Sequence, residues 1–224
     1  AVEGAGHKAD LLDLCFAGSI ERSIKAAVKH FRPDVVGVSV RNLDNCCWHN
    51  PHSYHESARQ IVEALRTHTE AEIVAGGTAV SVGGAEFLKY LGLKYGIAGE
   101  GERSFAGLLG MIEGRGADGV IPGLITVADG KATVTPPDYG GSLDTFPAGG
   151  AGLVNYTGYF KTGGFISVQT RRGCPFKCVY CSYPALEGCS YRLRSPGLCV
   201  DEIARLAADT GLRDFFFVDS VFND

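Results

Sequence analysis

The sequence predicts an α/β protein in which a doubly wound, Rossmann-like domain is followed by the start of a second β/α unit. Short apolar runs alternate with amphipathic segments from Ala9 to about Gly114, the order expected of alternating strands and helices. The apolar runs are continuous, as is typical of parallel strands that helices cover on both faces. With 224 residues, 45% of them hydrophobic, the chain can also bury a sizeable core.

Four segments are predicted to be strands of the first domain. Each is short and apolar, and within two residues of its end each meets glycine, asparagine or a charged residue, which are poor strand formers. These predicted strands are residues 11–16, 35–40, 72–75 and 94–98.

Three amphipathic segments are predicted to be helices that pack on this sheet. Ser19 is placed to cap the first helix and Pro33 to end it, whereas Asn50 is placed to cap the second and Pro51 to occupy its first turn. In each segment apolar side chains share one helical face. They are Ile20, Ile24, Ala27 and Phe31, then Ala58, Ile61, Val62 and Leu65, and finally Phe105, Leu108, Leu109 and Ile112.

Residues 1–113 are therefore predicted to form the first domain and residues 114–164 a connection to the second. Residues 125–134 have the pattern of a β-hairpin that turns at Asp129-Gly130, and prolines and glycines follow it. The alternative is that this segment is an extended edge of the first domain.

The second domain is predicted to span residues 165–224. A strand at 165–170 precedes a cysteine-containing loop, a helix opens at Ser195-Pro196 and ends at Gly211, and a second strand-like run follows at 215–218. Because the chain starts at Ala1 rather than Met and stops soon after that run, we expect the first strand of the first domain to be missing and the second domain to be truncated.

Composition narrows the class of protein. The net charge is −4 and basic residues are scattered, so a nucleic-acid partner is not expected. No apolar run has the roughly 20 residues that a membrane helix needs, and no signal peptide is evident, so a cytoplasmic location is expected. The eight cysteines are expected to be reduced, because a chain of this size does not need disulfides to fold.

Three cysteines, Cys174, Cys178 and Cys181, are spaced by three and then by two residues. Thiolates at this spacing can wrap one face of a 4Fe-4S cubane and leave the fourth iron open to a substrate or cofactor. Structural zinc is the leading alternative, with Cys189 as a fourth thiol, because such sites usually take four ligands. Plain buried cysteines are the other alternative.

This CxxxCxxC motif, with Tyr180 before its last cysteine, resembles that of radical S-adenosylmethionine (SAM) enzymes. In that family the cluster loop follows the first strand of a partial or full β/α barrel, which matches the predicted strand at 165–170. The resemblance implies that the three cysteines ligate the cluster and that Tyr180 lies near the adenine. It also places Asp219 and Ser220 near the cofactor's amino group, although the usual Gly-Gly-Glu sequence is absent.

Basic residues flank the cysteines, namely Arg171, Arg172 and Lys177. They can tune the cluster or balance its charge. A solvated basic patch without such a role is an equally acceptable interpretation.

In the first domain, ligands are expected at the carboxyl ends of the predicted strands, as in other doubly wound sheets. Three strand ends carry small or polar residues, and glycines there let a bulky ligand approach the backbone. A flavodoxin-type nucleotide site would explain the same pattern. The segments are Ser39-Val40-Arg41-Asn42, Gly76-Gly77-Thr78 and Gly99-Glu100-Gly101-Glu102.

Taken with the downstream cysteines, these strand ends resemble the cobalamin-binding domain that precedes the radical domain in one large subfamily. The resemblance implies that Ser39, Gly76 and Gly77 line the pocket for the nucleotide tail of cobalamin. Asn42, Thr78, Gly99 and Glu100 complete the predicted contacts.

Arg41 departs from the commoner pattern. Many cobalamin domains coordinate cobalt through the histidine of an Asp-x-His-x-x-Gly loop, which this sequence lacks. Either that loop is missing with the first strand, or Arg41 lies at the lower face of cobalamin and disfavours a further cobalt ligand. The alternative is that Arg41 only pairs with a carboxylate such as Asp44.

His49, His52 and His55 are not predicted to bind metal, because they straddle a helix start and no carboxylate or cysteine completes a familiar ligand set. The adjacent Cys46 and Cys47 are not expected to act as joint ligands, because neighbouring side chains diverge.

The leading functional hypothesis is a cobalamin-dependent radical SAM methyltransferase acting on a poorly activated carbon of a small-molecule or peptide-derived natural product. Tryptophan C-methylation is one example in the subfamily, and Arg41 and Tyr180 are the predicted catalytic residues. A ferredoxin or flavodoxin is the expected electron donor. A cyclase or ring-rearranging enzyme with the same cofactors is one alternative, and a non-catalytic corrinoid-binding module with a structural metal loop is another. A methylthiotransferase acting on RNA is disfavoured by the negative net charge of the chain. Such an enzyme also needs cluster cysteines in its first domain, and the spacing of Cys15, Cys46 and Cys47 is unsuitable for that.

Overall fold

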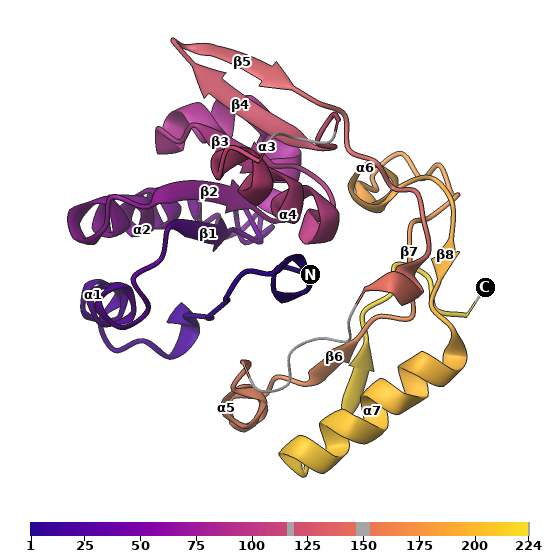
Figure 1. Cartoon of the computed structure of the whole chain (residues 1–224). Helices are drawn as coiled ribbons and strands as arrows, with labels where there is room; N and C mark the ends of the chain where they lie inside the picture. Colours follow the sequence, from indigo (N-terminus) through magenta and orange to yellow (C-terminus); the bar gives the residue numbers. More distant parts are fainter. Residues whose placement is uncertain (116–118, 147–152, 224) are drawn as a thin grey trace. The chain divides into compact units, whose positions relative to one another are not determined.

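The computed structural model describes residues 1–115, 119–146 and 153–223 and divides the chain into two units, residues 1–138 and 139–224. The first unit is built on a five-stranded sheet with strand order β1-β2-β3-β4-β5 (Figure 1). The first three strands are parallel, and β4 and β5 run antiparallel to their neighbours. The strands are β1 (Val35–Ser39), β2 (Glu72–Gly76), β3 (Tyr95–Ile97), β4 (Leu124–Ala128) and β5 (Lys131–Val134).

Helices cover both faces of this sheet, which confirms the predicted α/β class. On β2, Ile73 and Ala75 point into one core and Val74 into another, because successive side chains of a strand face opposite sides. The first core contains residues of α1 (Ile20–Phe31), α2 (His55–His68) and α3 (Thr78–Leu91), and the second contains Leu108 of α4 (Gly101–Ile112).

The predicted start and end of the first helix are confirmed. The Ser19 hydroxyl accepts the backbone N–H of Arg22 at 3.4 Å, and Arg32 adopts a left-handed conformation immediately before Pro33. The third predicted helix also forms, as α4, and it begins at Gly101 within the Gly99-Glu100-Gly101-Glu102 segment.

Three predictions for the first unit were wrong or incomplete. Residues 11–16 do not form a strand; instead, the Asp13 carboxylate accepts the N–H of Cys15 and turns the chain into a short 3-10 helix, Leu14–Phe16. Helix α2 begins at His55 rather than at Asn50, because residues 44–53 fold into their own loop. Helix α3 was missed because Gly83 and Gly84 interrupt its pattern, and Gly84 produces a kink with a φ of 55°.

The hairpin β4–β5 forms as predicted, with positive φ angles at Asp129 and Gly130. It does not lie in a connection between domains. Since β4 pairs with β3, the hairpin extends the sheet of the first unit, which is the alternative considered above. Residues 116–118 and 147–152 of the predicted connection lie outside the described residues.

Leu88 is one of the most deeply buried residues of the larger core, and truncating it is expected to destabilise the first unit. Its side chain is fully buried, and its terminal methyls fill the space that a side chain on Gly96 would need. We expect Leu88→Ala to lower the free energy of unfolding by ~3 kcal/mol, as for other buried leucines. Leu12→Ala is the matched control, because Leu12 is 41% exposed. Urea denaturation measures both, and equal effects of the two substitutions would contradict the assignment of the core.

The second unit contains a β/α unit of the predicted kind. Strand β6 (Ile166–Val168) pairs in parallel with β9 (Phe215–Phe217), and the two are linked through α7 (Pro196–Thr210). Helix α7 ends at Gly211, which has a φ of 73°. A second, antiparallel pair, β7 (Arg171–Arg172) with β8 (Arg192–Leu193), frames the cysteine loop and helix α6 (Tyr183–Glu187). Helix α5 (Tyr156–Lys161) precedes β6.

Among the described residues, no helix is both long and apolar enough to span a lipid bilayer.

Candidate functional site

A pocket of about 450 Å³ lies at the carboxyl ends of β1, β2 and β3. Its volume is within the roughly 300–1,000 Å³ of small-molecule sites. Of the predicted cofactor-binding residues, Ser39, Gly76, Gly77 and Gly99 line this pocket. Arg41, Asn42, Thr78 and Glu100 are not among its lining residues. The parallel strands therefore bring half of the predicted contacts together, at the edge where a doubly wound sheet places ligands.

Gly77 allows the backbone to cross the strand ends at close range. Its φ of 89° and ψ of 178° are a conformation that essentially only glycine adopts. A Cβ atom on Gly77 would lie 2.5 Å from the carbonyl oxygen of Val40. The glycine is thus required by the fold of the pocket, whatever the ligand.

Ser81 joins two of the strand ends and was missed in the sequence analysis. Its hydroxyl accepts the N–H of Gly99 at 2.8 Å and donates to the carbonyl of Gly77 at 3.3 Å. Ser81 lies one helical turn after Gly77, and this spacing could have indicated the contact. The spacing has that meaning only on a helix, and α3 was not predicted.

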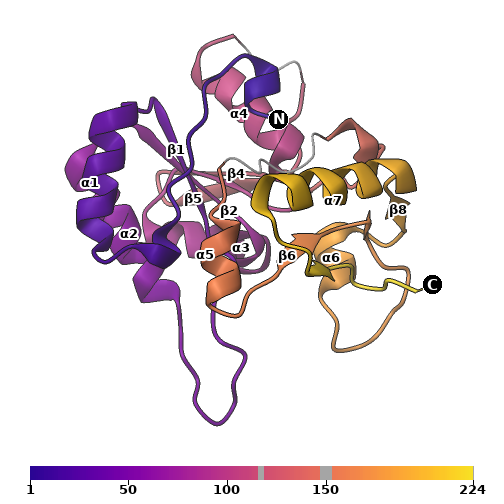
Figure 2. The same cartoon turned by 90° about the horizontal axis from the view of Figure 1, so that it is seen from below.

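The loop from Val40 to Tyr54 begins at the pocket and projects away from the sheet (Figure 2). Backbone hydrogen bonds from Asn45 to His52 and from Tyr54 to Leu43 hold its two sides together. The Asp44 carboxylate accepts the N–H of Cys46 at 2.7 Å, and this bond lowers the pKa of Asp44. The segment is thus a hairpin-like loop whose two sides are hydrogen-bonded to each other.

Arg41 and Asn42 lie at the root of this loop and are exposed. In the described part of the chain no ion pair links Arg41 to Asp44, so the structure does not support the alternative in which Arg41 only pairs with that carboxylate. His55 Nδ1 lies 2.6 Å from the Ser53 hydroxyl. His49, His52 and His55 do not form a group that could hold a metal ion among the described residues.

The cysteine loop in the second unit lies between β7 and α6. Cys174 is buried and donates its N–H to the carbonyl of Gly188 at 3.0 Å, while Cys181 donates its N–H to the carbonyl of Cys178 at 3.1 Å. Cys178 is exposed and Cys181 half-buried. Tyr180 is 88% exposed and packs little against the fold.

The three thiols are not gathered into a ligand group, and no metal-binding group of His, Cys, Asp or Glu occurs in the described ranges. The donor set itself fits an iron–sulfur cluster, since three free thiols lie on one loop of eight residues. The fourth thiol of a zinc site would have to be Cys189, which is exposed and directs its sulfur toward the Pro184 carbonyl at 3.8 Å.

Two of the three flanking basic residues, both of them arginines, are packed against aromatic rings. The guanidinium of Arg171 lies 5.0 Å from the ring centre of Tyr191, and that of Arg172 lies 5.6 Å from the ring centre of Phe146. Both arginines are half-buried, whereas Lys177 is exposed. A simple solvated basic patch therefore does not describe the arginines.

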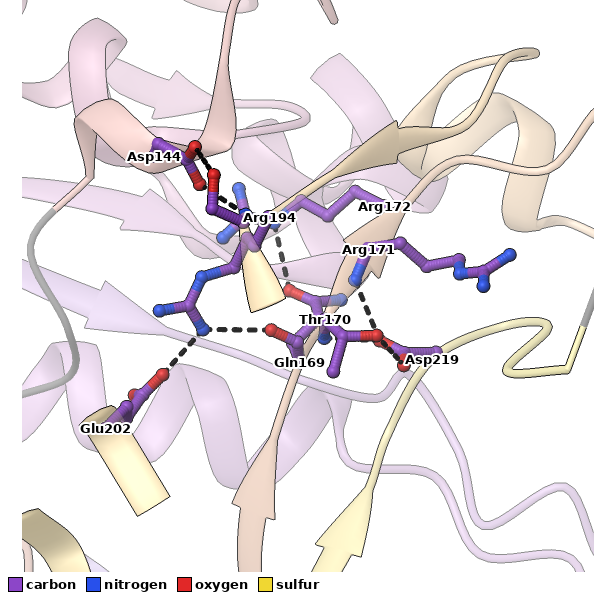
Figure 3. Close-up of polar contacts among 9 residues, drawn as sticks. Asp144, Gln169, Thr170, Arg171, Arg172, Arg194, Glu202 and Asp219 are labelled. Carbon is purple, nitrogen blue, oxygen red and sulfur yellow. Dashed lines mark hydrogen bonds and ion pairs between the residues drawn. The ribbon is translucent and has the colours of Figure 1, made fainter. Parts of the chain in front are cut away.

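A polar network surrounds the carboxyl end of β6 (Figure 3). Arg194 donates to the Gln169 carbonyl at 2.9 Å and pairs with Glu202 at 2.5 Å, and both charged side chains are at least 86% buried. The Asp219 carboxylate accepts hydrogen bonds from Thr170 and from the backbone N–H of Arg171. Asp219 is predicted to contact a cofactor, but in the structure its carboxylate bonds to other residues of the chain.

Ser195 and Asp144 form a further carboxylate contact at the start of α7. Ser195 donates its hydroxyl and its backbone N–H to Asp144, and these bonds lower the pKa of Asp144 from its ordinary value of 3.8. A carboxyl with a lowered pKa in the folded state stabilises the fold above its unfolded-state pKa. This contribution disappears as the pH falls through the folded-state pKa.

We therefore expect Ser195→Ala to lower stability at pH 7, and the difference from wild type to shrink as the pH falls below 3.8. Urea midpoints at neutral pH and at the most acidic pH that retains the fold measure this change. Ser57→Ala, which removes an exposed hydroxyl on α2, should give a pH-independent difference. An effect of Ser195→Ala that stays constant across this range would contradict the assignment.

Comparison with known proteins identifies relatives of both units. Residues 1–109 match the B12 binding domain family. The tryptophan 2-C-methyltransferase of Streptomyces laurentii is 27% identical to this chain over 278 aligned residues, which cover 100% of the chain and 45% of that protein. The hopanoid C-3 methylase of Methylococcus capsulatus is 26% identical over 97% of the chain and 40% of its own length. The chain thus spans less than half the length of these curated relatives.

Solved structures agree with these matches. The radical SAM methyltransferase TsrM from Kitasatospora setae, with tryptophan and a SAM analogue bound, matches with a TM-score of 0.85 and 30% identity over 99% of this chain and 43% of that one. The cobalamin-dependent SAM radical enzyme OxsB matches with a TM-score of 0.77 and 19% identity, which supports the fold alone.

Proposed function

We propose that this chain, which carries a B12 binding domain and is homologous to cobalamin-dependent radical SAM methyltransferases, acts in methyl transfer to a poorly activated carbon. The observation that carries the proposal is the combination of two sites in one chain. A pocket lies at the strand ends of the B12 binding domain, and a loop with three free thiols follows the first strand of a β/α unit.

In this proposal the pocket residues Ser39, Gly76, Gly77 and Gly99 hold cobalamin, and Arg41, Asn42, Thr78 and Glu100 extend the contact outside the pocket. The exposed guanidinium of Arg41 is available to approach the lower face of cobalamin and to disfavour a further cobalt ligand. Cys174, Cys178 and Cys181 hold a 4Fe-4S cluster, and Tyr180 lies near the adenine of SAM. When bound, these cofactors supply the methyl group, a cobalt carrier for it and the means to activate carbon.

The substrate class is taken from the relatives. One relative is named for C-methylation of tryptophan and another for methylation of hopanoids. We propose a small-molecule or peptide-derived natural product, with an aromatic substrate of the tryptophan kind as the first to test. A cytoplasmic location and an external electron donor such as ferredoxin or flavodoxin are part of the same proposal.

Anaerobic reconstitution tests the proposal. The protein is loaded with iron, sulfide and cobalamin and is incubated with SAM carrying an isotopically labelled methyl group and with tryptophan. Transfer of label to carbon supports methyl transfer. A cluster whose spectrum does not respond to SAM, or a protein that takes up cobalamin but forms no cluster, would refute the enzyme and leave only a corrinoid-binding module.

The spectrum of the cob(II)alamin complex tests the role of Arg41 separately. The proposal predicts no nitrogen ligand from the protein below cobalt in the wild type. A nitrogen-ligated signal would rule out the role of Arg41, without affecting the wider proposal.

A further inference from the structure

The segment that follows β9 holds the segment that leads into the cysteine loop. We call residues 170–173 the lead-in, because Cys174 follows it directly. Asp219 Oδ1 accepts the backbone N–H groups of Thr170 at 2.7 Å and of Arg171 at 3.1 Å, and Oδ2 accepts the Thr170 hydroxyl at 2.6 Å (Figure 3). One side chain thus makes three hydrogen bonds to two consecutive residues.

Two further bonds join the same segments. The Ser220 hydroxyl donates to the Gly173 carbonyl at 3.3 Å, and the guanidinium of Arg171 donates to the Phe222 carbonyl at 2.8 Å. The other end of the lead-in is held separately: Gly173 donates its N–H to the Glu187 carboxylate at 3.2 Å. A Cβ on Gly173 would lie 2.1 Å from the Ser190 carbonyl oxygen, so this end of the lead-in is tightly packed.

A carboxylate offers about four lone-pair sites, and Asp219 already uses three of them within the chain. We propose that Asp219 is a positioning residue: it fixes the lead-in, and through it Cys174, and does not bind the amino group of SAM. This inference rests in part on the proposed function, because it assigns Cys174 to the cluster. It changes the role of Asp219 from a cofactor contact to a support of the cluster loop.

The two possible roles of Asp219 differ in whether they need its negative charge. Binding the amino group of SAM needs the charge, whereas holding the lead-in does not. Both N–H groups bond to the same oxygen. Among the described residues the second oxygen bonds only to a hydroxyl, which can also accept a hydrogen bond. An asparagine can therefore replace Asp219 in the clamp, with its carbonyl on the two N–H groups and its amide on the hydroxyl. It cannot replace a carboxylate that neutralises an ammonium group.

The experiment compares Asp219→Asn, Asp219→Ala and Thr170→Val with wild type. The first readout is hydrogen exchange of the Thr170 and Arg171 amides, which needs no cluster. In Asp219→Ala we expect these amides to exchange at least about 10-fold faster than in wild type, because their bonds to a charged acceptor are lost. In Asp219→Asn we expect exchange rates within ~3-fold of wild type. Thr170→Val should lie between them. Ser57→Ala, which removes an exposed hydroxyl on α2 in the first unit, should leave these amides unchanged.

The second readout is the rate at which a chelator removes iron from the reconstituted protein, together with the affinity for SAM. The clamp predicts faster iron loss in Asp219→Ala, wild-type behaviour in Asp219→Asn and little change in SAM affinity. Equal losses of SAM affinity in both Asp219 variants, with unchanged amide exchange, would overturn it. A wild type that takes up no cluster would refute the proposed function, whereas the exchange data would still decide whether Asp219 holds the lead-in.

Discussion

Cys178→Ala is expected to eliminate the iron–sulfur cluster and, with it, any methyl transfer. Cys178 is the best of the three cysteines to replace because its side chain is exposed, whereas Cys174 is buried and its replacement would also disturb packing. Mutation of a residue that hydrogen-bonds to a metal ligand commonly lowers the affinity for the metal 10–100-fold. Loss of a ligand itself should therefore lower the affinity for the cluster by at least ~100-fold. Iron and sulfide content after reconstitution and the absorbance of the cluster measure the effect.

Cys189→Ala is the matched control for this prediction. Cys189 is also exposed, lies in the same unit and is the thiol that a four-cysteine zinc site would require. We expect it to leave iron content and activity unchanged. If Cys189→Ala lost metal as completely as Cys178→Ala, or if the bound metal were zinc, a structural zinc loop would replace the cluster in the proposal.

The parts of the fold that were predicted correctly are those in which local chemistry and packing agree. The first helix is an example, because Ser19, the apolar stripe from Ile20 to Phe31 and Pro33 all indicate the same boundaries. The hairpin at Asp129-Gly130 is another, since its turn requires positive φ angles that these residues tolerate. Its place in the sheet could not be predicted in this way, because pairing with β3 is a long-range contact.

The errors arose where side chains redirect the backbone. Asp13 bends a segment that is apolar enough for a strand, and Leu11 and Phe16 remain exposed there. Asn45 accepts the His52 N–H and donates to the Asn50 carbonyl, so the residue expected to cap α2 belongs to a loop instead. For the candidate site, strand ends could be predicted from glycines and polar residues. The internal use of Asp219 could not, because its partners lie 48 and 49 residues away in the sequence.

Gly77→Ala is expected to disable the pocket by destabilising its wall. The substitution places a methyl group 2.5 Å from the Val40 carbonyl oxygen and forces an L-residue into a conformation with φ of 89° and ψ of 178°. Backbone strain of this kind costs on the order of 1–3 kcal/mol, and the steric clash adds to it. We therefore expect ~3 kcal/mol or more of lost stability in urea denaturation, together with loss of the cobalamin absorbance after gel filtration.

Gly101→Ala is the control that distinguishes backbone strain from the addition of a methyl group to the pocket lining. Gly101 lines the same pocket, but it is the first residue of α4, and a Cβ there would meet no atom within 4 Å. Its effect on stability should stay within ~0.5 kcal/mol, as for substitutions without steric conflict. If Gly77→Ala were as stable as Gly101→Ala and still bound cobalamin, the close crossing of Gly77 and Val40 would not be needed to form the pocket. Retained stability with lost cobalamin would instead place the methyl group in the path of the ligand, which would make Gly77 a direct contact.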